Sequence, residues 1–166
     1  MKSIVIYTSR HGNTRRIAEA ITEALQSHGE AQLFPADEVL PVLPKGIDLI
    51  VVGGPTEAHR MTKPVARLFS RMGRAALQGM AAAAFDTRLR GSRMLTGSAG
   101  SGVARKLRRA GAQMIAPVES FLVRNQTDPD QPKLEPGELE RAAVWAESLA
   151  TLLTVAQEVT PPAAQS

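Results

Sequence analysis

The sequence predicts an α/β fold in which helices cover both faces of a parallel sheet. Short apolar segments alternate along the chain with segments whose apolar residues recur at helical spacing. The clearest strands, 3–7 (SIVIY) and 47–52 (IDLIVV), are nearly continuous in apolar residues, as expected for strands covered on both faces. Three polar segments, 8–14, 53–62 and 86–102, each follow a predicted strand, so we expect them to meet at one edge of the sheet.

In the first half of the chain, the helical period begins at Thr14 and ends before Gly29. Its apolar positions fall on one helix face: Ile17, Ile21, Ala24 and Leu25. A weaker strand (31–34) follows, and the proline-rich segment 35–46 is predicted to be mostly loop before the strand 47–52.

In the second half, a helix is predicted by the spacing of Val65, Leu68, Phe69 and Met72, and it ends at Gly73. The small-residue segment 80–85 predicts a strand, and a short basic helix around Val103 and Leu107 ends at Gly111. The last elements are a strand at 120–123, a proline-containing linker, and an amphipathic helix over 139–153.

Length and composition indicate one globular domain, predicted to span residues 1–159, with a disordered tail at 160–166. The chain has 166 residues, of which 43% are hydrophobic and 22% charged. No apolar run approaches the ~18 residues of a membrane span, and the N-terminal segment lacks the pattern of a signal peptide. The chain has no cysteine, which excludes disulfides and thiolate chemistry. We expect a cytoplasmic location.

Charge is distributed unevenly along the chain. Residues 60–109 contain twelve Lys or Arg and one acidic residue, Asp86, whereas the rest of the chain has eight basic and fifteen acidic residues. Such a basic segment either steers an acidic partner towards the protein or forms ordinary solvated helix faces.

The segment 7–18 (YTSRHGNTRRIA) leaves the first strand and opens the first helix, and this context favours an anion site. The first N–H groups of a helix have no intrahelical acceptor, and the helix dipole attracts negative charge. Ser9 and Thr14 supply hydroxyls, Gly12 permits close backbone approach, and Asn13 is a candidate helix cap. Neither the GxxxxGK[ST] motif nor GxGxxG follows this strand. The alternative is a capped turn that binds no ligand.

These residues resemble the start of the flavodoxin family, whose phosphate loop has the pattern S/T-x-T/S-G-x-T. Segment 48–59 (DLIVVGGPTEAH) is similar to that family's third strand and the loop beside the flavin, and 81–86 (AAAAFD) is similar to its fourth strand. The resemblance extends over residues 3–153. It implies a flavodoxin-like, three-layer, doubly wound fold with a five-stranded parallel sheet in the order 2-1-3-4-5, bound FMN, and electron transfer through the flavin.

The resemblance also implies which residues bind FMN. They fall in three segments: Ser9, Arg10, His11, Gly12, Asn13 and Thr14; Pro55, Thr56, Glu57, Ala58 and His59; and Asp86, Thr87 and Arg88. No catalytic residue is assigned. No metal site is predicted, because His11, His28 and His59 do not have the spacing of metal ligands.

The chain departs from the family pattern in two ways. His11 stands where a hydroxyl residue is usual, and neither ring-facing loop contains an aromatic side chain. The only Tyr and Trp, Tyr7 and Trp145, fall in a predicted strand and a predicted helix. Because aromatic stacking contributes strongly to ring binding, we expect the flavin ring to be held weakly and FMN to be lost readily.

Three functions remain open on the sequence alone. The favoured one is an FMN-dependent electron carrier with an acidic redox partner protein; we expect neither a nucleic-acid partner nor a membrane span. The second is a flavin-dependent oxidoreductase of the same superfamily, similar to protoporphyrinogen dehydrogenases or NAD(P)H:quinone reductases. The third is a non-redox binding module that has lost FMN.

Overall fold

The computed structural model describes residues 1–39, 43–56, 62–73, 75–90, 98–124 and 133–159. The predicted tail 160–166 lies outside these residues. Helices and strands alternate along the chain, as the sequence predicts. In chain order the elements are β1 (Lys2–Tyr7), α1 (Asn13–Gln26), β2 (Glu30–Pro35), β3 (Leu49–Pro55), α2 (Lys63–Arg71), β4 (Ala81–Leu89), α4 (Ala99–Arg109), β5 (Gln113–Met114), β6 (Glu119–Arg124), β7 (Lys133–Leu134) and α5 (Glu138–Val159).

The strands form one sheet in the order β2-β1-β3-β4-β6-β7, and β5 pairs with the start of β4. The five longer strands, β2, β1, β3, β4 and β6, are all parallel, which confirms the predicted doubly wound order. Two two-residue strands were not predicted: β5, which is parallel to β4, and β7, which pairs antiparallel with the end of β6. Segments of this length carry no periodic signal in the sequence.

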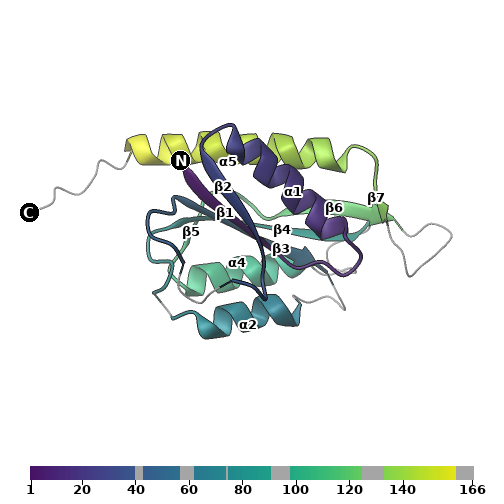
Figure 1. Ribbon diagram of the computed structural model, residues 1–166, viewed down its shortest axis with the longest axis horizontal. Helices are drawn as coiled ribbons and strands as arrows, with labels where there is room; N and C mark the ends of the chain where they lie inside the picture. The colour runs from purple at the N-terminus through teal and green to yellow at the C-terminus, as the bar shows by residue number, and fades with distance from the viewer. Residues whose placement is uncertain (40–42, 57–61, 74, 91–97, 125–132, 160–166) are drawn as a thin grey trace, which may run out of the picture.

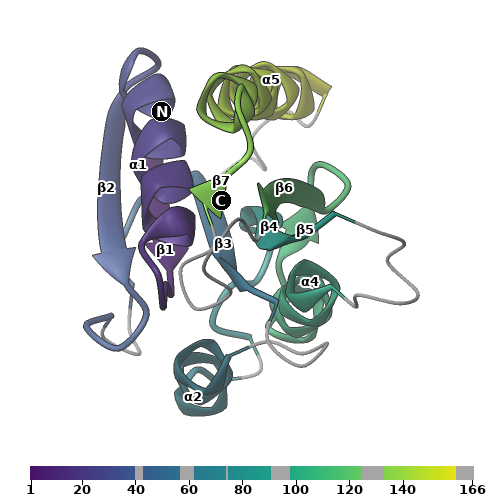
Figure 2. The same ribbon diagram turned by 90° about the vertical axis from the view of Figure 1, so that its right-hand side faces the viewer.

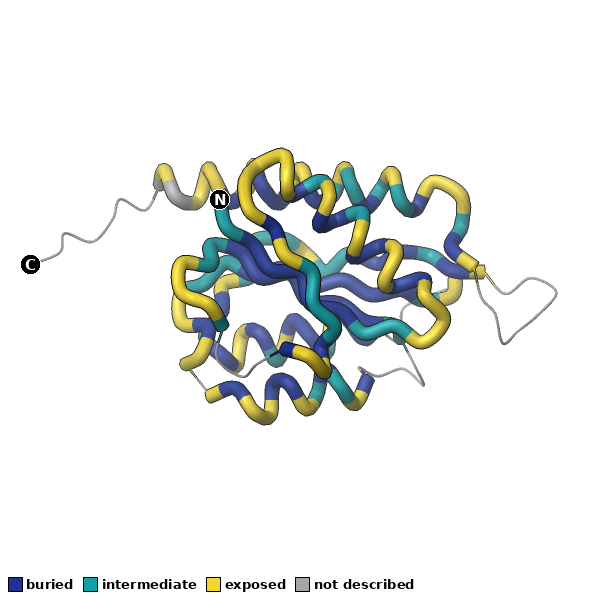
Figure 3. Tube along the Cα trace, in the orientation of Figure 1, coloured by how far each residue is buried: buried dark blue, intermediate teal, exposed yellow. Residues whose placement is uncertain are grey.

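Helices α1 and α5 lie on one side of the sheet and α2 and α4 on the other (Figures 1 and 2). Each side has its own apolar core, and the two cores draw alternate residues from the same strands. In β1, Val5 packs towards α1 and α5, whereas Ile4 and Ile6 pack towards α2 and α4. The central strands are therefore buried on both faces (Figure 3).

The strands β3 and β4 run further than the sequence pattern predicts. The sequence predicts a loop at Gly53, Gly54 and Pro55, but these residues continue the parallel ladder opposite Phe85, Asp86 and Thr87. Gly53 is required there, because a Cβ atom at this position would lie 2.3 Å from the Phe85 ring. The backbone pairing extends the strands although glycine and proline are poor strand residues.

The loop predicted at 86–102 is consequently shorter. Residues 86–89 belong to β4, and α4 begins at Ala99 rather than near Val103. Gly100 and Gly102 lie inside this helix, which sequence propensity disfavours. Close packing explains Gly100, since a Cβ atom there would lie 2.5 Å from Val118 Cγ1.

Helix α5 is anchored to the sheet by aromatic and ionic contacts. Phe85, Phe121 and Trp145 form three edge-to-face pairs with ring centroids 6.0–6.3 Å apart. The guanidinium of Arg141 lies 4.6 Å from the centroid of the Phe121 ring, on the same side of the sheet. Trp145, on the sheet-facing side of α5, is partly buried against the apolar core, so its ring is used for packing.

Candidate functional site

The carboxyl ends of β1, β3 and β4 meet at one edge of the sheet, and hydroxyl side chains connect them. Thr8, after β1, and Thr62, before α2, have their Oγ1 atoms 2.8 Å apart. Thr14 of α1 and Thr87 of β4 form a second, buried pair with Oγ1 atoms 2.7 Å apart. This edge therefore brings together the three segments that the sequence analysis selected, through contacts between residues more than 50 positions apart.

The N-terminus of α1 is open. Its N-cap residue is Gly12, in a left-handed conformation with φ = 81°, and glycine has no side chain with which to cap the first turn. The expected cap, Asn13, is instead the first helical residue, because glycine adopts the left-handed conformation that this turn requires. The first turn contains no acidic residue. The positive end of the helix dipole at this turn therefore favours an anion.

Ser9 adds a side-chain donor to this end of the helix. Its Oγ atom is buried and makes no hydrogen bond to any part of the chain that the structure describes. A buried hydroxyl without a partner costs about 1–3 kcal/mol, so an acceptor supplied by a ligand would relieve it. The donor set of backbone N–H groups and a serine hydroxyl fits a phosphate group.

A hollow of about 820 Å³ opens beside the first turn of α1. Most of its lining is cationic or polar, and only one of the lining residues is acidic. The lining residues are His11, Gly12, Asn13, Arg15, Arg16, Glu19 and Lys133. Arg15 is already paired with Glu19, with 2.7 Å between Nε and Oε1. Arg16 is exposed and reinforces the positive potential at this helix end, and His11 is exposed beside it.

The N-terminus of α4 is capped by protein side chains, and Asp86 is the main one. This aspartate is fully buried, and its Oδ2 accepts hydrogen bonds from Ser98 Oγ (2.6 Å), Gly100 N–H (3.0 Å) and Thr56 Oγ1 (3.3 Å). Ser98 also caps the helix by accepting from the N–H of Ser101. Asp86 Oδ1 is buried without a hydrogen bond among the described residues. A protein carboxylate therefore occupies this helix end, which is the position an anion would otherwise take.

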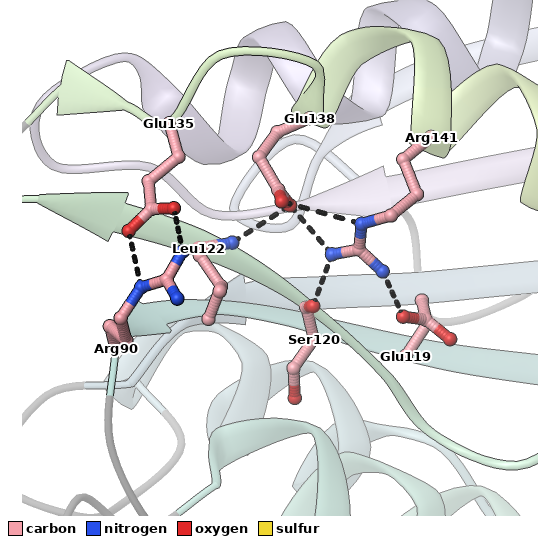
Figure 4. A network of polar contacts seen from close by, with 7 residues as sticks. All are labelled: Arg90, Glu119, Ser120, Leu122, Glu135, Glu138 and Arg141. Carbon is pink, nitrogen blue, oxygen red and sulfur yellow. Dashed lines mark hydrogen bonds and ion pairs between the residues drawn. The ribbon is translucent and has the colours of Figure 1, made fainter.

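At the same edge, ion pairs link the ends of β4 and β6 to the start of α5 (Figure 4). Glu138, in the first turn of α5, accepts the N–H of Leu122 (2.9 Å) and pairs with Arg141 (2.6 Å). Arg90, just past β4, binds both carboxylate oxygens of Glu135. Hydrogen bonds from Arg90 hold the pKa of Glu135 below its usual value of 4.5. Carboxylates serve the first turns of α4 and α5, whereas α1 and α2 have no acidic residue in theirs.

The predicted cofactor residues are distributed as follows. Ser9, Arg10, His11, Gly12, Asn13 and Thr14 lie together around the start of α1. Pro55 and Thr56 lie beside Thr87, because the N–H of Thr56 donates to the carbonyl of Thr87 (2.9 Å). Arg88 is half-buried in β4. Glu57, Ala58 and His59 lie outside the described residues.

Two features of this edge were missed by the sequence reasoning. The Thr14–Thr87 contact joins residues 73 positions apart, and no local pattern indicates it. The role of Asp86 had a signal: an aspartate at the end of a strand, followed by Ser98 immediately before a helix, is a candidate pair of capping residues.

Family membership follows from these features in two steps. The fold and its edge define a doubly wound α/β protein whose loops with hydroxyl side chains meet at the carboxyl edge of its sheet. A family profile described as the flavodoxin domain matches residues 4–94, more than half of the chain. The protein belongs to the flavodoxin family, a family of flavin-binding electron carriers. No curated protein sequence matches the chain.

Solved structures agree with this assignment. A flavodoxin from the domain Archaea is 26% identical, with a TM-score of 0.74 over 93% of this chain and 99% of that one. Flavodoxin 1 from Bacillus cereus is 18% identical, with a TM-score of 0.76 over 91% and 98% of the two chains. Rubredoxin oxygen:oxidoreductase from Desulfovibrio gigas shares the fold at 17% identity and a TM-score of 0.71; the match covers 93% of this chain but 36% of that larger protein. None of the helices that the structure describes could span a membrane.

Proposed function

We propose that this protein binds FMN, with the phosphate at the N-terminus of α1, and acts as an electron carrier. The observation that carries the proposal is the open helix end, where Gly12 leaves the first turn uncapped and the buried Ser9 hydroxyl has no hydrogen-bond partner among the described residues. The family assignment supports a flavin as the ligand. When bound, FMN supplies electron transfer through its ring.

Each part of the edge has a role in this proposal. The first N–H groups of α1 and the hydroxyl of Ser9 donate to the phosphate, the His11 imidazole offers a further N–H donor, and Arg16 adds positive charge. Pro55 and Thr56 at the end of β3, and the residues from Thr87 at the end of β4, flank the ring. The ring contacts of Glu57, Ala58 and His59 are proposed from the family resemblance alone.

We further propose an acidic redox partner and a cytoplasmic location. The partner's charge is inferred from the basic segment 60–109. The location is inferred from the absence of cysteine, since disulfides are typical of oxidising compartments.

The absorption spectrum of the purified protein tests the cofactor. We expect flavin bands in the visible region after reconstitution with FMN, and a protein that takes up no flavin would leave only the non-redox binding module. Turnover of NAD(P)H with a quinone by the isolated chain would favour the oxidoreductase alternative over the carrier.

Thr14→Ala tests the phosphate position. A hydroxyl bond to a charged group contributes about 1.5–3 kcal/mol, so its loss should weaken FMN binding by about ten- to a hundredfold. Thr14→Ser keeps the hydroxyl and serves as the control. Unchanged FMN affinity in the alanine variant would remove Thr14 from the phosphate site.

A further inference from the structure

The two helical layers carry opposite charge. On α2 and α4 there are seven basic residues and no acidic residue: Lys63, Arg67, Arg71, Arg105, Lys106, Arg108 and Arg109. On α1 and α5 there are six acidic and three basic residues. Because the sheet separates these layers (Figure 2), the molecule has a charge dipole directed through the sheet. We call the seven residues on α2 and α4 the basic layer.

The cations of α2 form a single row. Lys63, Arg67 and Arg71 are spaced four residues apart and are all exposed, whereas Val65, Leu68 and Phe69 face the core. At 1.5 Å per residue, the row extends about 12 Å along the helix. Within the described part of the chain, none of the basic layer takes part in an ion pair. Its charge is therefore not neutralised by the protein.

The row begins at the candidate cofactor edge and runs away from it. Lys63 directly follows Thr62, whose hydroxyl contacts Thr8 at the carboxyl end of β1. The cations of α4 lie at the far edge, since the end of α4 contacts the segment before β4 through the bond from Leu77 N–H to the carbonyl of Ala110. The basic layer thus extends over the α2 and α4 side of the molecule, and its Lys63 end lies at the candidate cofactor edge.

The surface chemistry of the two helices favours a protein partner. The exposed residues beside the cations are small or hydroxyl-bearing, such as Ser70 and Ser101. Phe69, the one aromatic residue of these two helices, is buried, so they offer no platform for stacking bases. Their apolar residues face the core, so they offer no apolar face for insertion into a lipid surface.

We propose that the basic layer is the docking surface for an acidic partner protein. A partner seated on α2 reaches the candidate cofactor edge at Lys63. That this partner exchanges electrons with the protein rests on the proposed function. The acidic layer of α1 and α5 repels the same partner, so the dipole orients the encounter before contact. The expected acidic partner thus has a defined docking surface and a preferred orientation.

Binding of fluorescently labelled poly-L-glutamate at low salt tests the surface directly. Arg67→Glu should weaken binding by about fivefold or more, since each reversal replaces an attraction with a repulsion. Ser70→Glu and Thr151→Glu form a matched pair. Both residues are exposed and helical with hydroxyls bonded back to a helix carbonyl, but Ser70 is on α2 and Thr151 on α5. We expect weaker binding for the α2 variant and no change for the α5 variant.

Three results would overturn the proposal. Equal losses in Ser70→Glu and Thr151→Glu would mean that only net charge matters. Tighter binding of a single-stranded oligonucleotide or of phosphatidylserine vesicles than of poly-L-glutamate would assign the surface to a different macromolecule. Self-association abolished by Arg67→Glu would assign it to a second copy of the chain. The poly-L-glutamate measurement needs no flavin, so it stands if FMN fails to bind.

The electron-transfer part is tested on protein loaded with FMN. Oxidation of the reduced flavin by anionic ferricyanide should slow in Lys63→Glu and remain unchanged in Thr151→Glu. Equal rates in the two variants would show that the docking surface does not influence electron transfer at the cofactor edge, and would overturn that part of the proposal.

Discussion

The helices α1 and α4 begin at the same edge of the sheet, each after a parallel strand, yet their N-termini differ. At α4, Asp86 and Ser98 take up the free N–H groups of the first turn, and Asp86 is fully buried. At α1, Gly12 provides no cap and the Ser9 hydroxyl has no partner among the described residues. One helix end is stabilised by the protein itself, and the other requires a ligand for the same stabilisation.

This difference separates structural from functional residues at one edge. Residues at the α4 end should govern stability with or without a ligand, whereas residues at the α1 end should govern affinity. The next three changes test that division, and a fourth concerns the ion pair near the start of α5.

Asp86→Ala should have the largest effect, and it should act on stability. It leaves the half-buried Ser98 hydroxyl and the buried Gly100 N–H without their acceptor, which we expect to lower the free energy of unfolding by about 3 kcal/mol. Chemical denaturation of the ligand-free protein measures this loss. Asp37→Ala, at an exposed position, is the control and should change stability by less than about 0.5 kcal/mol. Equal stability of the two variants would show that α4 does not depend on Asp86.

Ser9→Ala should have the opposite profile. Because its hydroxyl has no partner in the ligand-free chain, the stability of that chain should change little. FMN affinity should fall by about ten- to a hundredfold, as expected for a lost bond to a charged group. Flavin fluorescence titration and denaturation on the same samples separate the two quantities. A destabilised variant with unchanged FMN affinity would reverse the assignment.

The Thr14–Thr87 pair joins the two regions and should give a coupled effect. Thr14→Val or Thr87→Val leaves one buried hydroxyl without its partner and should cost about 1–2 kcal/mol of stability. Removing both hydroxyls should cost less than the sum of the single changes, because no unpaired hydroxyl remains. A double-mutant cycle by chemical denaturation measures this coupling, and strict additivity would show that the contact contributes nothing.

Low pH should weaken the ion pair between Arg90 and Glu135, near the start of α5. Hydrogen bonds from Arg90 lower the pKa of this carboxyl group in the folded protein, so its contribution to stability is complete above the ordinary pKa of 4.5. The contribution is lost as the pH falls through the lowered pKa. The stability difference between wild type and Arg90→Gln should therefore shrink between about pH 6 and pH 3. Lys45→Gln, which removes an exposed cation with no ion pair within the described residues, should show no such convergence.

The sequence predicted the positions of the helices and longer strands well, because periodicity and strand–helix alternation are local signals. The strand order was implied by the resemblance to the flavodoxin family. Strand ends were predicted less accurately: β3 continues through Gly53, Gly54 and Pro55 because of pairing with β4, a partner distant in sequence. Gly12 and Ser9 were identified from their position after the first strand. Thr14 contacts Thr87, and Asp86 contacts Ser98, only because of how the helices and strands pack. The local sequence around each residue does not reveal such a partner.

The most direct test of the open α1 end is a comparison of FMN with riboflavin, which lacks only the phosphate. Titration of the flavin-free protein should give clear binding of FMN and very weak or undetectable binding of riboflavin. We expect this because the phosphate site provides the main contacts and the ring-facing segments have no aromatic side chains. Riboflavin affinity equal to that of FMN would contradict the account, because binding would then depend on the ring and not on the N-terminus of α1.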